Sequence, residues 1–142
     1  MFPVRLIYAS TLSERCGPDD VQDILEASRA FNRANDITGL LFFNADYFLQ
    51  CLEGKRQAVN ELYNTIQGDS RHTRVILLDY EGTSTRMFAD WSMAYLAGTH
   101  VDPDILAKYF PDGRFNPYLL DSETAHALTW DLSRQLGKAD LF

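Results

Sequence analysis

The sequence predicts an α+β fold in which two helices cover one face of a sheet. Hydrophobic residues follow strand and helix spacing in the order strand, helix, strand, strand, helix, strand. The chain has 142 residues, of which 46% are hydrophobic, a length and composition that suit a single globular core. This order is the ferredoxin-like split βαβ arrangement, βαββαβ, with an added fifth strand and a helical C-terminal tail.

The expected strands are short runs of β-branched, aromatic and aliphatic residues. They cover residues 4–10, 37–43, 47–52, 75–80 and 91–97. The second and third are separated by a connection of hairpin length, which predicts an antiparallel pair. Both are apolar at nearly every position, as expected when each face of a sheet is covered.

Two helices are expected between the strands. Asp19 and Asp20 put negative charge in the first turn of a helix that runs to about Ala34. The second begins after Gly54 and stops at Gly68.

The body of the domain is expected to be residues 1–98, and residues 99–142 form the helical tail. The tail contains a short apolar segment, 105–110, and a last helix with Ser122 as N-cap and Gly137 as its stop. Because the sheet has a second apolar face, we expect the tail to cover it.

Charge and composition exclude several classes of protein. The 20 acidic and 13 basic residues give a net charge of −7 without a basic stripe, which argues against direct nucleic-acid binding. The chain has neither a signal peptide nor an apolar run long enough to span a membrane, so a cytoplasmic protein is expected. Cys16 and Cys51 are interpreted as free thiols, and the scattered histidines lack metal-ligand spacing. No nucleophile elbow or phosphate-binding loop is present, so the sequence gives no reason to expect an enzyme.

Polar residues inside apolar elements are the strongest functional signal. Gln50 interrupts a strand that otherwise reads as buried, and Tyr8 does the same in the first strand. Ser28 and Asn32 lie on the inward stripe of the first helix. Since an unpaired buried polar group costs roughly 1 to 3 kcal/mol, the four together indicate a buried polar ligand between sheet and helix.

From Val4 to about Ala97 the chain resembles the BLUF domains, blue-light sensors that use flavin adenine dinucleotide (FAD). The matching stretches are residues 5–10, 23–25 with Ser28 and Asn32, 37–41, 48–54, 69–72 and 91–93. Phe31 departs from the pattern, because several family members carry a polar residue there.

The resemblance implies FAD, or FMN, as cofactor, with its ring between the helices and Ile24 and Ile66 at its faces. Asn32 would bond a flavin carbonyl, and Gln50 would bridge the ring and the Tyr8 hydroxyl. The cofactor-binding residues that it implies are Tyr8, Ile24, Leu25, Ser28, Arg29, Asn32, Leu41, Phe48, Gln50, Ile66, Asp69, Arg71 and His72. Of these, Arg29, Asp69, Arg71 and His72 would lie toward the ribityl phosphate.

The mechanism implied by the resemblance is photochemical. Tyr8 would give an electron and a proton to the excited flavin by way of Gln50, whose amide is left rearranged, and Met93 or Trp91 would pass the change to the tail. Because no output module follows before Phe142, we expect a separate signalling partner and a homo-oligomer.

Two alternatives stay open from the residues alone. A ferredoxin-like regulatory domain that binds a colourless metabolite would use the same buried polar set. An acylphosphatase-like hydrolase rests on the fold only, and no arginine lies in a glycine-rich loop after the first strand.

Overall fold

The computed structural model describes residues 2–14 and 16–138. Five strands form one sheet in the order β4-β1-β3-β2-β5. The strands are β1 (Val4–Leu12), β2 (Thr38–Phe43), β3 (Tyr47–Gly54), β4 (His72–Gly82) and β5 (Ala94–Ala97). All neighbours are antiparallel except β2 and β5, which run parallel. The predicted βαββαβ arrangement with an added strand is confirmed.

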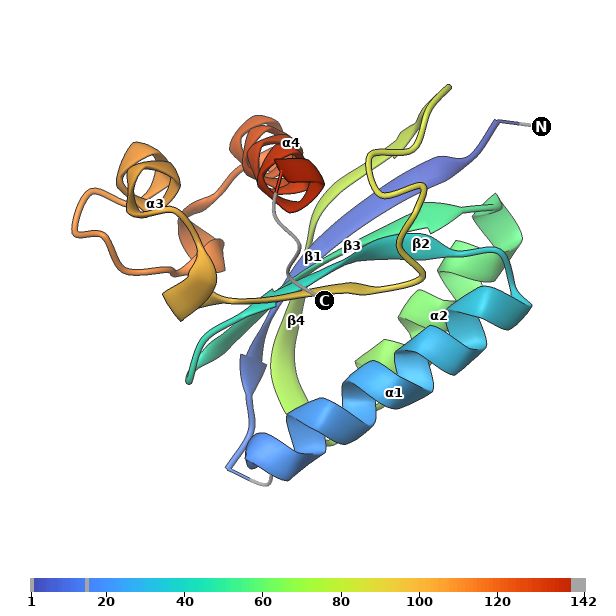
Figure 1. Cartoon of the computed structure of the whole chain (residues 1–142). Helices are drawn as coiled ribbons and strands as arrows, with labels where there is room; N and C mark the ends of the chain where they lie inside the picture. The colour runs from blue at the N-terminus through green and yellow to red at the C-terminus, as the bar shows by residue number, and fades with distance from the viewer. Residues whose placement is uncertain (1, 15, 139–142) are drawn as a thin grey trace.

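Helices cover both faces of this sheet (Figure 1). They are α1 (Pro18–Ala34), α2 (Arg56–Gln67), α3 (Pro103–Tyr109) and α4 (Ser122–Lys138), with 3-10 turns η1 (Gly98–His100) and η2 (Pro117–Leu119). In Figure 1, α1 and α2 lie below the sheet and α3 and α4 above it. The tail therefore covers the second face, as expected, although its residues 139–142 lie outside the described part of the chain.

Alternation along β1 divides the core into two layers. Leu6 and Tyr8 pack on the side of α1 and α2. Ile7 points to the other side, where it joins a cluster that includes Phe88 from the β4–β5 connection and Leu128 from α4. Because this tail-side core is built from residues on both sides of position 98, the tail completes the sheet's packing. The division into units 1–98 and 99–142 stays a prediction.

The ends of two helices show what fixes them. At α1, Asp20 Oδ2 accepts the backbone N–H of Gly17 at 2.7 Å, and the acidic first turn suits the helix dipole. At α4 the N-cap is Asp121, whose Oδ1 accepts the N–H of Thr124 at 2.8 Å. The prediction of Ser122 as N-cap was therefore wrong by one residue, and the helix continues through Gly137 to Lys138.

The fifth strand is shorter than predicted, beginning at Ala94 instead of residue 91. Two backbone carbonyls before it bond to side chains of α1: Asn32 Nδ2 donates to the Ser92 oxygen at 2.7 Å, and Arg29 Nε donates to the Met93 oxygen at 3.2 Å. Since these carbonyls are held by a helix, this segment does not continue the strand. Across residues 2–14 and 16–138, no helix has the length and apolar character needed to cross a membrane.

Removing residues 99–142 would expose the tail-facing side of the sheet, including Phe42 and Leu49. We expect the truncated protein to aggregate and to bind a hydrophobic dye, because an apolar face of this kind requires cover. Size-exclusion chromatography and dye fluorescence measure this. A monodisperse truncation that binds no dye would show that the tail is dispensable for the fold.

Truncating one buried tail residue tests the same packing more gently. Leu128 is fully buried, so Leu128→Ala should lower the free energy of unfolding by about 2 to 5 kcal/mol. Leu119 lies in the same tail but is 64% exposed. Leu119→Ala should therefore change the free energy of unfolding by less than about 0.5 kcal/mol. Urea denaturation measures both, and equal losses would contradict this description of the tail-side core.

Candidate functional site

The Tyr8 and Gln50 side chains meet across neighbouring strands. The two residues are direct partners in the antiparallel register of β1 and β3, so both side chains lie on the same face of the sheet, toward α1 and α2. Each is 3% exposed. The Tyr8 hydroxyl donates a hydrogen bond to Gln50 Oε1. The sequence-predicted pair is therefore in direct contact inside the protein.

Burial determines the protonation state of Tyr8. Desolvation raises the pKa of its phenol well above the ordinary value, and the nearby Tyr63 and Asp69 add to the rise. Tyr8 therefore stays a neutral phenol throughout the physiological pH range. It can donate its proton to Gln50 but cannot exist there as a stable phenolate.

The side-chain amides of Gln50 and Asn32 are incompletely satisfied. Gln50 Nε2 lies 3.7 Å from Met93 Sδ, and a thioether is only a weak acceptor. Asn32 is fully buried, and its Nδ2 bonds to the Ser92 carbonyl. Its Oδ1 is buried with no hydrogen-bond partner among the described residues. Because such atoms are costly to leave unpaired, they indicate where a polar ligand could add hydrogen bonds.

A pocket of about 270 Å³ opens beside Gln50, between the sheet and the helices α1 and α2. Most of the sequence-predicted cofactor residues line it. They are Tyr8, Ile24, Ser28, Leu41, Phe48, Gln50, Ile66, Asp69, Arg71 and His72. Apolar side chains of α1 and α2 line one side of the pocket. The sheet lines the other side, where the polar groups of Tyr8 and Gln50 lie.

Three predicted residues lie outside the pocket lining. Leu25 belongs to the buried core between helices and sheet. Arg29 and Asn32 hold the backbone carbonyls of residues 92 and 93. Met93 is buried against Gln50, whereas Trp91 packs against the tail-side core.

Sequence reasoning missed Ala27, Leu62 and Thr65, which also line the pocket, and it noted Phe31 only as a departure. The helical spacing of the sequence could have identified them. Ala27 and Phe31 are one turn apart on α1, as are Leu62 and Ile66 on α2, so each pair shares a helix face. The pocket wall therefore follows one face of each helix.

The mouth of the pocket is polar and internally paired. The Arg71 side chain holds Asp69 through three hydrogen bonds: Nε donates to Oδ1 at 3.0 Å and to Oδ2 at 3.1 Å, and Nη2 donates to Oδ2 at 2.6 Å. These hydrogen bonds lower the pKa of Asp69. His72 Nε2 lies 2.6 Å from the Ile66 carbonyl oxygen, which can only accept, so this nitrogen carries a proton.

Metal and thiol chemistry find no support in this part of the molecule. Within the described residues, no group of three or more His, Cys, Asp or Glu side chains could hold a metal ion. Cys16 and Cys51 are both free thiols, as expected. Cys51 is completely buried, and desolvation raises its pKa well above the ordinary value, which makes it unreactive.

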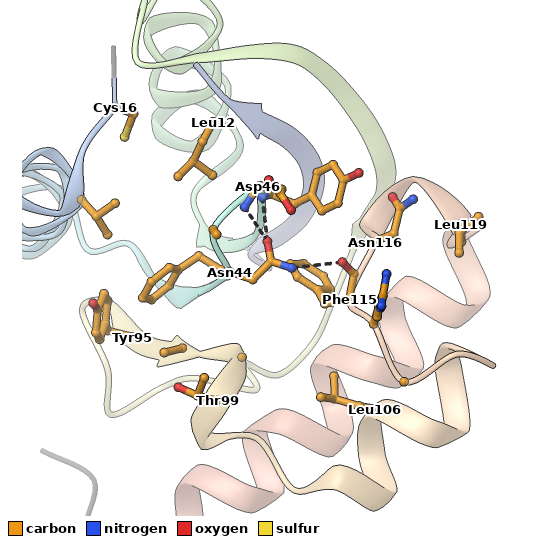
Figure 2. Close-up of a pocket in the computed structure, with 18 of the residues that line it drawn as sticks. Leu12, Cys16, Asn44, Asp46, Tyr95, Thr99, Leu106, Phe115, Asn116 and Leu119 are labelled. Atoms are coloured by element: carbon orange, nitrogen blue, oxygen red, sulfur yellow. Dashed lines mark hydrogen bonds between the residues drawn. The ribbon is translucent and has the colours of Figure 1, made fainter. Parts of the chain in front are cut away.

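A larger pocket of about 900 Å³ lies at the end of the sheet, where the β2–β3 hairpin meets the tail. Figure 2 shows Asn44 at its centre, donating to the Phe115 carbonyl and accepting from the N–H groups of Asp46 and Tyr47. Asn44 thus closes the β2–β3 hairpin and joins it to the tail. The smaller pocket is the better candidate site, because it is lined by the buried Gln50 amide, whose Nε2 has only a weak sulfur acceptor.

Comparison with solved structures finds close matches to the whole arrangement. The photo-activated state of BlsA aligns with a TM-score of 0.82 at 33% identity, covering 92% of this chain and 94% of that one. The dark-state structure of BlrB, a BLUF protein, aligns with a TM-score of 0.78 at 30% identity, covering 95% and 98%.

Longer proteins contain a similar region. The photoactivated adenylate cyclase subunit beta of Euglena longa is 31% identical over 100 residues, which are 69% of this chain and 11% of that protein. The blue light- and temperature-regulated antirepressor BluF of Escherichia coli (strain K12) is 28% identical over 109 residues, 76% of this chain and 27% of that protein. The chain thus spans about a tenth of the cyclase subunit's length.

A family model described as sensors of blue light using FAD matches residues 4–94, which include β1 to β4 and the Tyr8–Gln50 pair. Together with the solved structures, this match shows that the chain belongs to the BLUF family.

Proposed function

We propose that this chain senses blue light through a flavin bound non-covalently in the pocket between α1, α2 and the sheet. The observation that supports it best is the position of the Gln50 amide. It accepts from the Tyr8 hydroxyl and lines the pocket, and among the described residues its Nε2 bonds only to the Met93 sulfur, a weak acceptor. A ligand with hydrogen-bonding atoms at its edge would satisfy the remaining hydrogen-bonding capacity of this amide.

The residues around the pocket fit a flavin. Ile24 from α1 and Ile66 from α2 offer apolar surface to a planar ring, while Gln50 offers an amide to its edge. Asn32 does not line the pocket, but its buried Oδ1 has no hydrogen-bond partner among the described residues and could accept from a ring N–H of a bound flavin. At the mouth, Arg71 is paired with Asp69 but has further guanidinium N–H groups that could donate to a phosphate. FAD is the flavin in the family's description, and these residues fit FMN as well.

A bound flavin would supply absorption of blue light and a temporary electron acceptor. The protein itself would move one proton between Tyr8 and Gln50. Because the Tyr8 O–H points at Gln50 Oε1, a Tyr8 that loses an electron passes its proton to that oxygen and recovers it when the electron returns. Exclusion of water by burial keeps this proton between the two side chains.

Rearrangement of the Gln50 amide would store the signal. An amide presents a donor and an acceptor, so exchanging their positions reverses the local hydrogen-bond pattern without adding charge. In the present arrangement Oε1 accepts from Tyr8 and Nε2 approaches Met93 Sδ. After exchange the oxygen would face Met93, whose sulfur cannot donate. The Gln50–Met93 contact would therefore be lost, which gives β5 and the tail a local change to respond to.

The proposed output is a contact with a separate signalling protein, made by a homo-oligomer of a chain that is not itself an enzyme. Relatives named as cyclase subunits and as an antirepressor show that this family serves several kinds of regulated protein. The net charge of −7 supports a protein partner over nucleic acid. Cytoplasmic location stays a prediction. The family match favours a light sensor over the metabolite-binding and hydrolase alternatives.

The purified protein should be yellow, because a bound flavin absorbs blue light. Blue illumination should shift its absorption slightly to the red, and the shift should reverse in the dark. Spectra recorded before, during and after illumination measure this, and chromatography of the released pigment separates FAD from FMN. A colourless protein that also takes up neither added flavin would end the proposal.

Replacing Gln50 by Leu should preserve the yellow colour and abolish the reversible red shift, since leucine has no donor and acceptor to exchange. Gln57→Leu is the matched control, because Gln57 lies exposed on α2 and bonds only Glu61 among the described contacts. The absorption of the Gln57→Leu variant should shift to the red under blue light as that of the original protein does. A normal shift in the Gln50→Leu variant would refute the role given to the amide.

A further inference from the structure

Glu53 does not line the pocket. Its carboxylate is fully buried on the other face of the sheet, the face that the tail covers. Its Oε2 accepts the backbone N–H of Met87 at 2.7 Å, and its Oε1 accepts that of Phe88 at 2.9 Å. The Thr38 hydroxyl approaches Oε1 at 3.4 Å. One carboxylate thus holds two consecutive amides of a connecting segment.

Burying the Glu53 carboxylate costs free energy that its hydrogen bonds must offset. Burial raises the pKa of Glu53, and the Met87 and Phe88 hydrogen bonds and the charge of Arg5 oppose that rise. Arg5 is its register partner on β1 but directs its guanidinium to Glu81. The backbone amides are therefore the main direct partners of Glu53. A buried carboxylate is expensive unless hydrogen bonds of this kind compensate it.

The segment that Glu53 holds has an unusual path. Because β4 and β5 form opposite edges of the sheet, residues 83–93 must cross β1, β3 and β2 (Figure 1). Glu53 lies on β3, the central strand, and so fixes the crossing near its middle. Arg86, one residue earlier, adds a bond to the Asp36 carbonyl at 2.9 Å.

The far end of the segment reaches the candidate site. The Trp91 N–H donates to the Phe88 carbonyl at 3.0 Å, and Gly39 N–H donates to the Trp91 carbonyl at 3.1 Å. Met93 then places its sulfur against Gln50. Since Gln50 and Glu53 belong to the same strand, β3 contacts one segment from both faces of the sheet, through Glu53 on the tail side and through Gln50 on the pocket side.

We propose that Glu53 is a positioning residue for the light response: it fixes the 87–88 turn and thereby holds Met93 against the Gln50 amide. This inference rests on the proposed function. Weakening the anchor lets the segment follow either amide orientation, so it lowers the barrier between the lit and dark arrangements. The lit state then returns to the dark state faster.

Glu53→Gln tests the anchor with nearly unchanged shape. The amide keeps one acceptor oxygen but presents NH₂ in place of the other, so one backbone amide loses its partner. We expect dark recovery to accelerate at least about threefold, a factor within the range that corresponds to one hydrogen bond. The decay of the red-shifted absorption after a light pulse measures it.

Val59→Ala is the matched control, because Val59 is fully buried on α2, on the other side of the sheet from Met87 and Phe88, and does not line the pocket. It should lower the melting temperature and leave the recovery rate unchanged. An unaltered rate in Glu53→Gln, or equal acceleration in both variants, would overturn the positioning role. If the original protein shows no reversible shift, the proposed function fails and this inference fails with it.

A second measurement uses the unmodified protein and needs no variant to fold. The Met87 and Phe88 amides, bonded to a buried carboxylate, should be protected from hydrogen exchange in the dark. Continuous blue light should increase their exchange rates at least about threefold, and the amide of Val59 on α2 should be unaffected. Equal Met87 and Phe88 exchange rates in light and dark would refute coupling between this anchor and the site.

Discussion

The Tyr8–Gln50 hydrogen bond depends on the register of the two central strands. β1 is paired on both sides, and β3 lies between β1 and β2, so neither strand can shift alone. A slip of one residue would turn Gln50 to the tail side and bring Leu49 or Cys51 to the pocket. The covered sheet thus fixes the contact between a phenol and an amide, and the arrangement of helices around it follows from the need to bury both faces.

Two buried faces give the sheet two separate tasks. On one face, α1 and α2 leave a pocket beside Gln50, and on the other the tail closes an apolar core around Phe88 and Leu128. β3 connects them, because alternation along one strand puts Gln50 and Glu53 on opposite faces. The crossing segment 83–93 is the only described chain segment that both residues contact directly by side-chain hydrogen bonds.

The sequence was informative where one residue type conflicted with its surroundings. Gln50 and Tyr8 were identified because a polar group in an apolar strand requires a partner, and the strand and helix periods predicted the sheet around them. Glu53 gave no such signal, since a glutamate at the end of an apolar run is typical of an exposed strand end. The start of β5 could not be predicted either. It depends on carbonyls held by Asn32 and Arg29, side chains distant in sequence.

The chemistry of sulfur makes Met93 sensitive to the proposed rearrangement of the Gln50 amide. A thioether can accept a weak hydrogen bond but cannot donate one, so it distinguishes an amide that shows NH₂ from one that shows oxygen. A hydroxyl in its place could bond either end and would respond little. Methionine is also flexible, and a flexible side chain on a loose backbone could simply follow the amide. The difference between the two states becomes a displacement of the chain only if the backbone of residues 87–93 is held, which is the task that Glu53 performs in this proposal.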